Sequence, residues 1–249
     1  MPIHPSDNSA RRGPSRFATT HWSVVLAAGR PGTTDYEDAL ETLCQTYWFP
    51  LYAYLRRHGY NADMAEEYTQ AFFAGLLAKR GLRLADPKRG KFRSFLLSAL
   101  KHFVANEHAR ATAQKRGGGR KLLSLNLQDA ENRYALEPSD ELSPEKLFER
   151  SWALTVLERT MDQLQSEAAD ADKQKQFNCL KVYLTAEKSS VPYEKMAAEL
   201  QMTEGTVRVA VHRLRRRYRD LLRDEIAQTV TNESQIDEEI RDLFTALAR

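Results

Sequence analysis

The sequence predicts an all-α protein with two helical domains, a flexible linker between them and one further helix at the C-terminal end. Three observations support this fold class. Apolar residues recur every three or four positions over long stretches, which is the period of an amphipathic helix. No convincing run of alternating apolar and polar residues indicates a sheet. A segment rich in Gly and polar residues, 117–143, separates two helical regions and is typical of a connector.

These observations divide the 249 residues into five parts. They are an N-terminal extension with a short helix (1–35), a helical bundle (36–116), the linker (117–143), a second helical domain (144–226) and an acidic helical extension (227–249).

The segments before the linker follow from local patterns. They are a disordered stretch (1–16), a short helix (20–28) and three longer helices at about 36–58, 63–79 and 92–113. A bend is expected at Pro50, and Gly59 ends the first long helix. Each long helix has one apolar stripe, so we expect the three to pack around a common core.

The segments after the linker end in a distinctive pair of helices. Pro144 begins a long helix, and another helix is expected over 177–184. The segment 193–200 then predicts a short helix, followed by a tight turn and by Thr203, which is a good N-cap for a longer helix. A short helix, a turn and a longer helix with a polar outer face are what a helix-turn-helix requires.

Charge is distributed unevenly along the chain, although the net charge is only +3. The segment 79–121 has 13 basic residues and two acids, and the segment 208–223 has seven arginines and one acid. The last segment, 224–249, has seven acids and two arginines. Two basic blocks with an acidic tail indicate a polyanion as partner.

The seven arginines of 208–223 have two interpretations. They could merely solvate an exposed helix, but such helices usually mix acids with bases to gain i,i+4 pairs. Arginine also suits phosphates and the O6/N7 edge of guanine. We therefore favour a helix that lies in a DNA major groove.

Three stretches carry a resemblance to a known family. TEGTVRVAVHRLRRRYRDLLR closely resembles the promoter-recognition helix of the extracytoplasmic-function (ECF) branch of the sigma-70 family, the specificity subunits of bacterial RNA polymerase. ALETLCQTYWFPLYAYLRRHGYNADMAEEYTQAFFAGLLAK is similar to that family's second domain, and KFRSFLLSALKHFVANEHAR looks like the following promoter-melting helix. TTHWSVVLAA and YEKMAAEL resemble a subgroup with extended termini. The resemblance covers roughly 36–225, so it implies a sigma region 2-like domain at 36–116 and a region 4-like domain at 144–226.

The resemblance also implies three sets of site residues. Binding to polymerase is expected from Asp63, Glu66, Glu67, Gln70, Phe73 and Leu77. Contact with the downstream element and the opened strand is expected from Arg89, Lys91, Arg93, Lys101, His102, Asn106 and Arg110. Reading of the upstream element is expected from Thr206, Arg208, Val209, His212, Arg213 and Arg216. The chain departs from the family pattern at Phe95, where Trp is usual, and at His102, where Asn is usual.

Other classes of function find little support in the sequence. The histidines lack metal-ligand spacing and no phosphate-loop, GxSxG or HExxH motif occurs, so we expect no enzyme activity, no metal and no cofactor. Cys44 and Cys179 are expected to be reduced thiols, and no signal peptide or membrane span is found, so a cytoplasmic location is expected. The expected partners are core RNA polymerase, promoter DNA and, as a regulator, either an anti-sigma factor or the chain's own C-terminal helix.

Two alternatives stay open. The chain could be a helix-turn-helix regulator that binds DNA without polymerase, or, more distantly, a helical RNA-binding or scaffolding protein. For the tail, Ser234 can cap a helix whose apolar stripe comprises Ile236, Ile240, Leu243, Phe244 and Leu247. Such a stripe packs on its own chain or binds another protein. Our hypothesis is that this acidic helix docks on a domain and tunes DNA access.

Overall fold

The computed structural model describes residues 35–78, 91–113, 127–137, 142–185, 191–227, 230 and 235–248. Within these ranges ten helices, α2 to α11, are present and no strand occurs, which confirms the all-α prediction. The predicted disordered stretch at 1–16, the short helix at 20–28 and the cap residue Ser234 lie outside the described residues. No helix in the described ranges is long and apolar enough to cross a membrane.

The first three helices form the predicted bundle. They are α2 (Asp35–Arg57), α3 (Ala62–Ala78) and α4 (Phe92–Ala113). Tyr47 of α2 is fully buried and its ring meets the edge of the Phe92 ring of α4 at a centroid distance of 5.5 Å. Helix α2 continues through Pro50. It ends at Arg57. Gly59, with φ +98°, donates to the Arg56 carbonyl and Tyr60 donates to the Leu55 carbonyl, so the two hydrogen bonds form a Schellman motif.

The predicted linker contains a helix, α5 (Leu127–Ala135), where the sequence pattern indicated a connector. Glu131 of α5 makes an ion pair with Arg56 of α2 at 2.7 Å and also accepts a hydrogen bond from the Tyr52 hydroxyl. Arg133 lies over the Phe49 ring at 4.1 Å from its centroid. These side-chain contacts hold α5 against α2, and none of them can be read from the local pattern.

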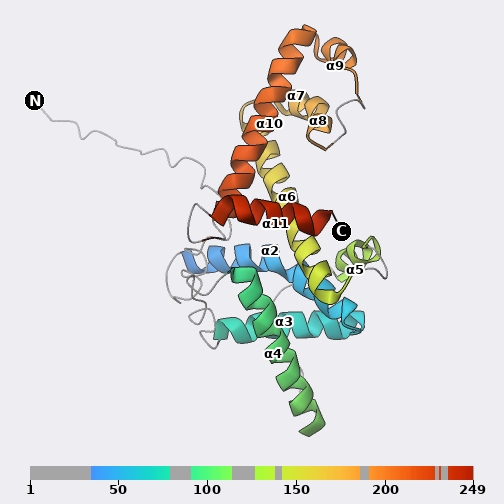
Figure 1. Cartoon of the computed structure of the whole chain (residues 1–249), viewed down its shortest axis with the longest axis vertical. Coiled ribbons are helices and arrows are strands. Elements are labelled where there is room, and N and C mark those ends of the chain that lie inside the picture. The colour runs from blue at the N-terminus through green and yellow to red at the C-terminus, as the bar shows by residue number, and fades with distance from the viewer. Residues whose placement is uncertain are drawn as a thin grey trace, which may run out of the picture.

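Helix α6 (Pro144–Asp170) begins where predicted, with the Ser143 hydroxyl accepting a hydrogen bond from the Lys146 amide. Its first half packs on α2 and buries Leu147, Phe148 and Trp152 in the same core as the bundle. Its second half reaches the helices that follow. The core therefore crosses the domain boundary expected at residue 143, and α6 connects the two ends of the molecule (Figure 1).

The second end of the molecule is built from α7 (Gln174–Leu180), α8 (Val182–Thr185), α9 (Tyr193–Leu200) and α10 (Glu204–Ala227). Where one helix was expected over 177–184, the structure has the two short helices α7 and α8. Helices α9 and α10 have the predicted starting residues. The N-terminal half of α10 projects to the end of the molecule that is farthest from α3 and α4 (Figure 1).

Helix α11 (Ile236–Leu247) lies across the middle of the molecule, against α6 and the C-terminal half of α10 (Figure 1). Ile236 and Leu243 are buried there, whereas Phe244 is 54% exposed. Most of the predicted apolar stripe thus packs on this chain, and Phe244 does not belong to it.

Candidate nucleic-acid interface

The turn between α9 and α10 fixes the direction of the arginine-rich helix. Gln201 adopts the left-handed conformation with φ 53°, and the Met202 amide donates a hydrogen bond to the Ala197 carbonyl at 3.0 Å. Thr203 then caps α10, since its hydroxyl accepts from the Thr206 amide at 3.2 Å. The predicted helix, turn and N-cap are confirmed.

A small core holds α10 against its neighbours. Val207 and Val211 of α10 are buried with Met196 of α9, Leu180 of α7 and Tyr183 of α8. These contacts leave the opposite face of α10 in solvent and fix its orientation. The outer face is therefore presented by a rigid unit.

All six predicted upstream-element residues are exposed on α10: Thr206, Arg208, Val209, His212, Arg213 and Arg216. Val209 is 51% exposed and lies on the same outer face as Arg208, His212 and Arg213. An exposed valine among arginines can contact the methyl group of thymine while the arginines bind phosphates or guanine.

The arginines of α10 differ in how they are paired. Arg208 pairs with Glu204 and lies over the Tyr193 ring, and the hydrogen bond from Arg208 to Glu204 raises the pKa of the guanidinium. Arg217 pairs with Glu167 of α6. Arg213 and Arg216, by contrast, have no carboxylate within ion-pair distance in the described part of the chain. These two cations are available to an external anion without breaking an intramolecular pair.

The residues expected to contact an opened strand fall into two groups. Lys101, His102 and Asn106 are exposed on α4, and Lys101 pairs with Glu145 of α6 at 2.8 Å. Arg89 and the side chain of Arg110 lie outside the described residues.

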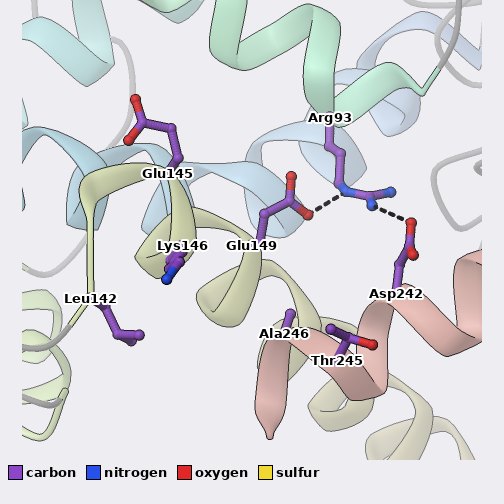
Figure 2. Close-up of a pocket in the computed structure, with 8 residues that line it drawn as sticks. All are labelled: Arg93, Leu142, Glu145, Lys146, Glu149, Asp242, Thr245 and Ala246. Carbon is purple, nitrogen blue, oxygen red and sulfur yellow. Dashed lines mark hydrogen bonds and ion pairs between the residues drawn. The ribbon is translucent and has the colours of Figure 1, made fainter. Parts of the chain in front are cut away.

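Lys91 and Arg93 form the second group, and the structure does not present them to solvent as expected. Arg93 is only 5% exposed, with Nε 2.6 Å from Glu149 of α6 and its guanidinium 4.3 Å from the centre of the Trp152 ring. Glu239 of α11 pairs with both Arg93 and Lys91, and Figure 2 shows Arg93 between Glu149 and Asp242. Helix α11 covers these two cations because their basic surface meets its acidic face.

A cavity of about 310 Å³ lies next to Arg93, between α6 and α11 (Figure 2). Its lining is largely charged: Arg93, Leu142, Glu145, Lys146, Glu149, Asp242, Thr245 and Ala246. A metal-ligating cluster of three or more His, Cys, Asp or Glu side chains does not occur among the residues that the structure describes.

The predicted polymerase-binding residues on α3 do not form one exposed patch. Asp63 and Glu67 are exposed, and Glu66 is half-buried and accepts a hydrogen bond from Gln70 at 2.8 Å. Gln70 is only 7% exposed and Phe73 only 3%, so neither is available to a partner. The reason is helical geometry, which turns these two positions toward the core. The Leu77 side chain lies outside the described residues.

Sequence reasoning missed the partners of Arg93 and Lys91. Glu239 and Asp242 were counted only as part of an acidic tail, and no local pattern pairs Trp152 with Arg93. A usable signal exists for the acids, because their i,i+3 spacing puts them on one face of α11.

Comparison of the chain with protein-family models, with curated proteins and with solved structures finds no match in any of the three.

Proposed function

We propose that this chain is a sigma factor of the ECF type, which binds core RNA polymerase and directs it to promoters. The observation that carries the DNA-binding part is the outer face of the α9–α10 unit. Arg213 and Arg216 lie there beside exposed Val209, and neither arginine has a carboxylate partner among the described residues. The polymerase part rests on the sequence resemblance.

In this proposal the N-terminal half of α10 enters the major groove of the upstream element. Arg213 and Arg216 donate to guanine edges or to phosphates, and Val209 meets thymine methyl groups. The burial of Val207 and Val211 supports this role, because it keeps the reading face in a fixed orientation.

The bundle has the second role in the proposal. The exposed Lys101, His102 and Asn106 of α4 offer a cation, a ring and an amide to the bases and phosphates of a separated strand. The exposed carboxylates Asp63 and Glu67 of α3 offer a charged surface to a basic face of polymerase. This leaves a reduced polymerase-binding set, because Gln70 and Phe73 belong to the core.

The test is run-off transcription by purified core RNA polymerase on a library of random promoters, with and without this chain. A sigma factor yields discrete transcripts only when the chain is present, and the double variant Asp63→Asn with Glu67→Gln yields fewer. Absence of any start site would contradict the proposal.

The α9–α10 unit equally suits a helix-turn-helix regulator that binds DNA without polymerase. A pull-down with core enzyme separates the two, since the regulator is not retained. Sequence-selective DNA binding without retention or initiation favours the regulator.

A further inference from the structure

We propose that Lys91 and Arg93 form a binding site for the phosphates of a DNA strand, and that α11 covers this site with Glu239 and Asp242 in the place of phosphates. This inference rests on the proposed DNA-binding function and adds to it a second state, in which the site is closed.

The contacts on α11 match the chemistry of a phosphate chain. Glu239 lies 2.6 Å from the Lys91 ammonium group and also contacts the Arg93 guanidinium. Asp242 contacts Lys91 as well and lies 3.6 Å from Nη2 of Arg93. Two anionic groups in sequence therefore bridge two cations. Guanidinium binds phosphate oxygens with the same forked donors that it uses for carboxylates.

The cationic side of the contact is held in place by elements other than α11. Glu149 of α6 accepts from Nε of Arg93 at 2.6 Å, and the Trp152 ring lies against the guanidinium at 4.3 Å. Figure 2 shows Glu149 at one end of the guanidinium and Asp242 at the other. Glu149 and Trp152 both belong to α6, so these two contacts with Arg93 do not depend on α11.

The contact between α11 and the Lys91–Arg93 pair also has features that allow a polyanion to displace α11. Glu239 is 1% exposed, and burying a carboxylate costs much of what its ion pairs contribute. The pocket beside Arg93 is open, so solvent and solutes reach this edge of the α6–α11 contact. Asp237, at the start of α11, pairs with Arg223 of α10, but both side chains are solvent-exposed, and such pairs contribute little.

The first measurement uses full-length chains with isosteric neutral substitutions on α11. Glu239→Gln with Asp242→Asn removes the anionic cover, and Glu238→Gln is the matched control because Glu238 lies on the exposed side of the same helix. Binding to a fluorescent single-stranded oligonucleotide is measured by anisotropy over a range of salt concentrations. Hydrogen exchange of the α11 amides reports whether the helix is docked.

We expect the double variant to bind the oligonucleotide more tightly than the parent, with faster exchange in α11, whereas Glu238→Gln changes neither. Two additional phosphate contacts steepen the dependence of log K on log salt by about 1.4, at roughly 0.7 per contact on a single strand. Adding Lys91→Ala to the double variant should remove about half of that increase in the salt dependence. Lys91 is only half-buried, so this variant does not disturb the core.

Two outcomes overturn the inference: α11 is released without a gain in affinity, or α11 stays protected and affinity stays at the parental value. If either occurs while the parent still initiates transcription, only the masking by α11 is refuted. If the parent neither initiates transcription nor binds DNA, the proposed function itself fails.

Discussion

The most direct test of the DNA-reading face is the substitution Arg213→Ala. Arg213 is exposed on α10 and has no carboxylate partner in the described part of the chain, so its removal breaks no intramolecular ion pair. Alanine is also the best helix former, so the stability of α10 is retained. Any loss of DNA affinity in this variant therefore reports on a contact with DNA.

The size of the loss follows from the kind of contact. A bidentate arginine contact with guanine contributes about 1 to 3 kcal/mol of discrimination, which corresponds to roughly 5- to 150-fold in Kd. The assay is fluorescence anisotropy with a duplex selected from a random library and with a scrambled duplex of the same length. We expect the loss on the selected duplex only, with relaxed preference at one base pair.

Arg217→Ala is the matched control for the loss of one positive charge on the same helix. Arg217 pairs with Glu167 of α6, and both side chains are partly exposed, so its loss lowers stability by about 0 to 1 kcal/mol. It should leave the base preference unchanged. If Arg213→Ala weakens binding to both duplexes equally, Arg213 contacts phosphate and base reading is refuted. If the two variants have the same effect on specificity, the outer-face assignment is refuted.

Two further predictions concern the bundle. Gly59→Ala should lower the free energy of unfolding by about 1 to 2 kcal/mol, because the φ of +98° at Gly59 disfavours any residue with a Cβ. Gly75→Ala within α3 should raise the free energy of unfolding by about 0.5 to 1 kcal/mol. Equal midpoints of urea unfolding for the two variants would contradict this. The hydrogen bond from Arg56 lowers the pKa of Glu131, so this carboxylate stabilises the folded chain above its unfolded pKa, near 4.5, and the stabilisation is lost as the pH falls through the lowered value. The free energy of unfolding, measured as a function of pH, should therefore fall more in the parent than in Glu131→Gln below that pH. Parallel pH curves for the two proteins would refute the role of the pair.

The helix bounds that the sequence predicted well are those fixed by local chemistry. Ser143 caps α6 and Thr203 caps α10 with hydrogen bonds to amides three residues ahead, so both signals lie within one turn of the sequence. The three- and four-residue period of apolar side chains likewise places Val207 and Val211 on the inner face of α10, where both are buried. The outer face of α10 was therefore predictable as well, because it consists of the positions that do not belong to the apolar stripe.

Helix α5 shows where local signals end. It has nine residues, which is too short for an isolated helix to be stable in water. Its stability comes from contacts with α2, among them the Glu131 pair with Arg56 and the Arg133 contact with Phe49. These residues lie more than 70 positions apart in the sequence, so the pattern at 127–135 alone indicated a connector.

Arg93 and Arg213 lie in the two basic blocks that the sequence indicates, but Arg93 is buried and Arg213 is exposed. Counting charges predicts the sign of the potential over a region, but it does not say whether a given cation is available, because an acid far along the chain can reach it. Glu239 is 146 positions after Arg93 and is buried more deeply than Arg93, with 1% of its surface exposed against 5%. No carboxylate in the described part of the chain lies within ion-pair distance of Arg213. The N-terminal half of α10 extends beyond α6 and α11 (Figure 1). The fold thus leaves one basic surface open and covers the other, so binding to duplex and to single-stranded DNA should respond differently to changes in α11.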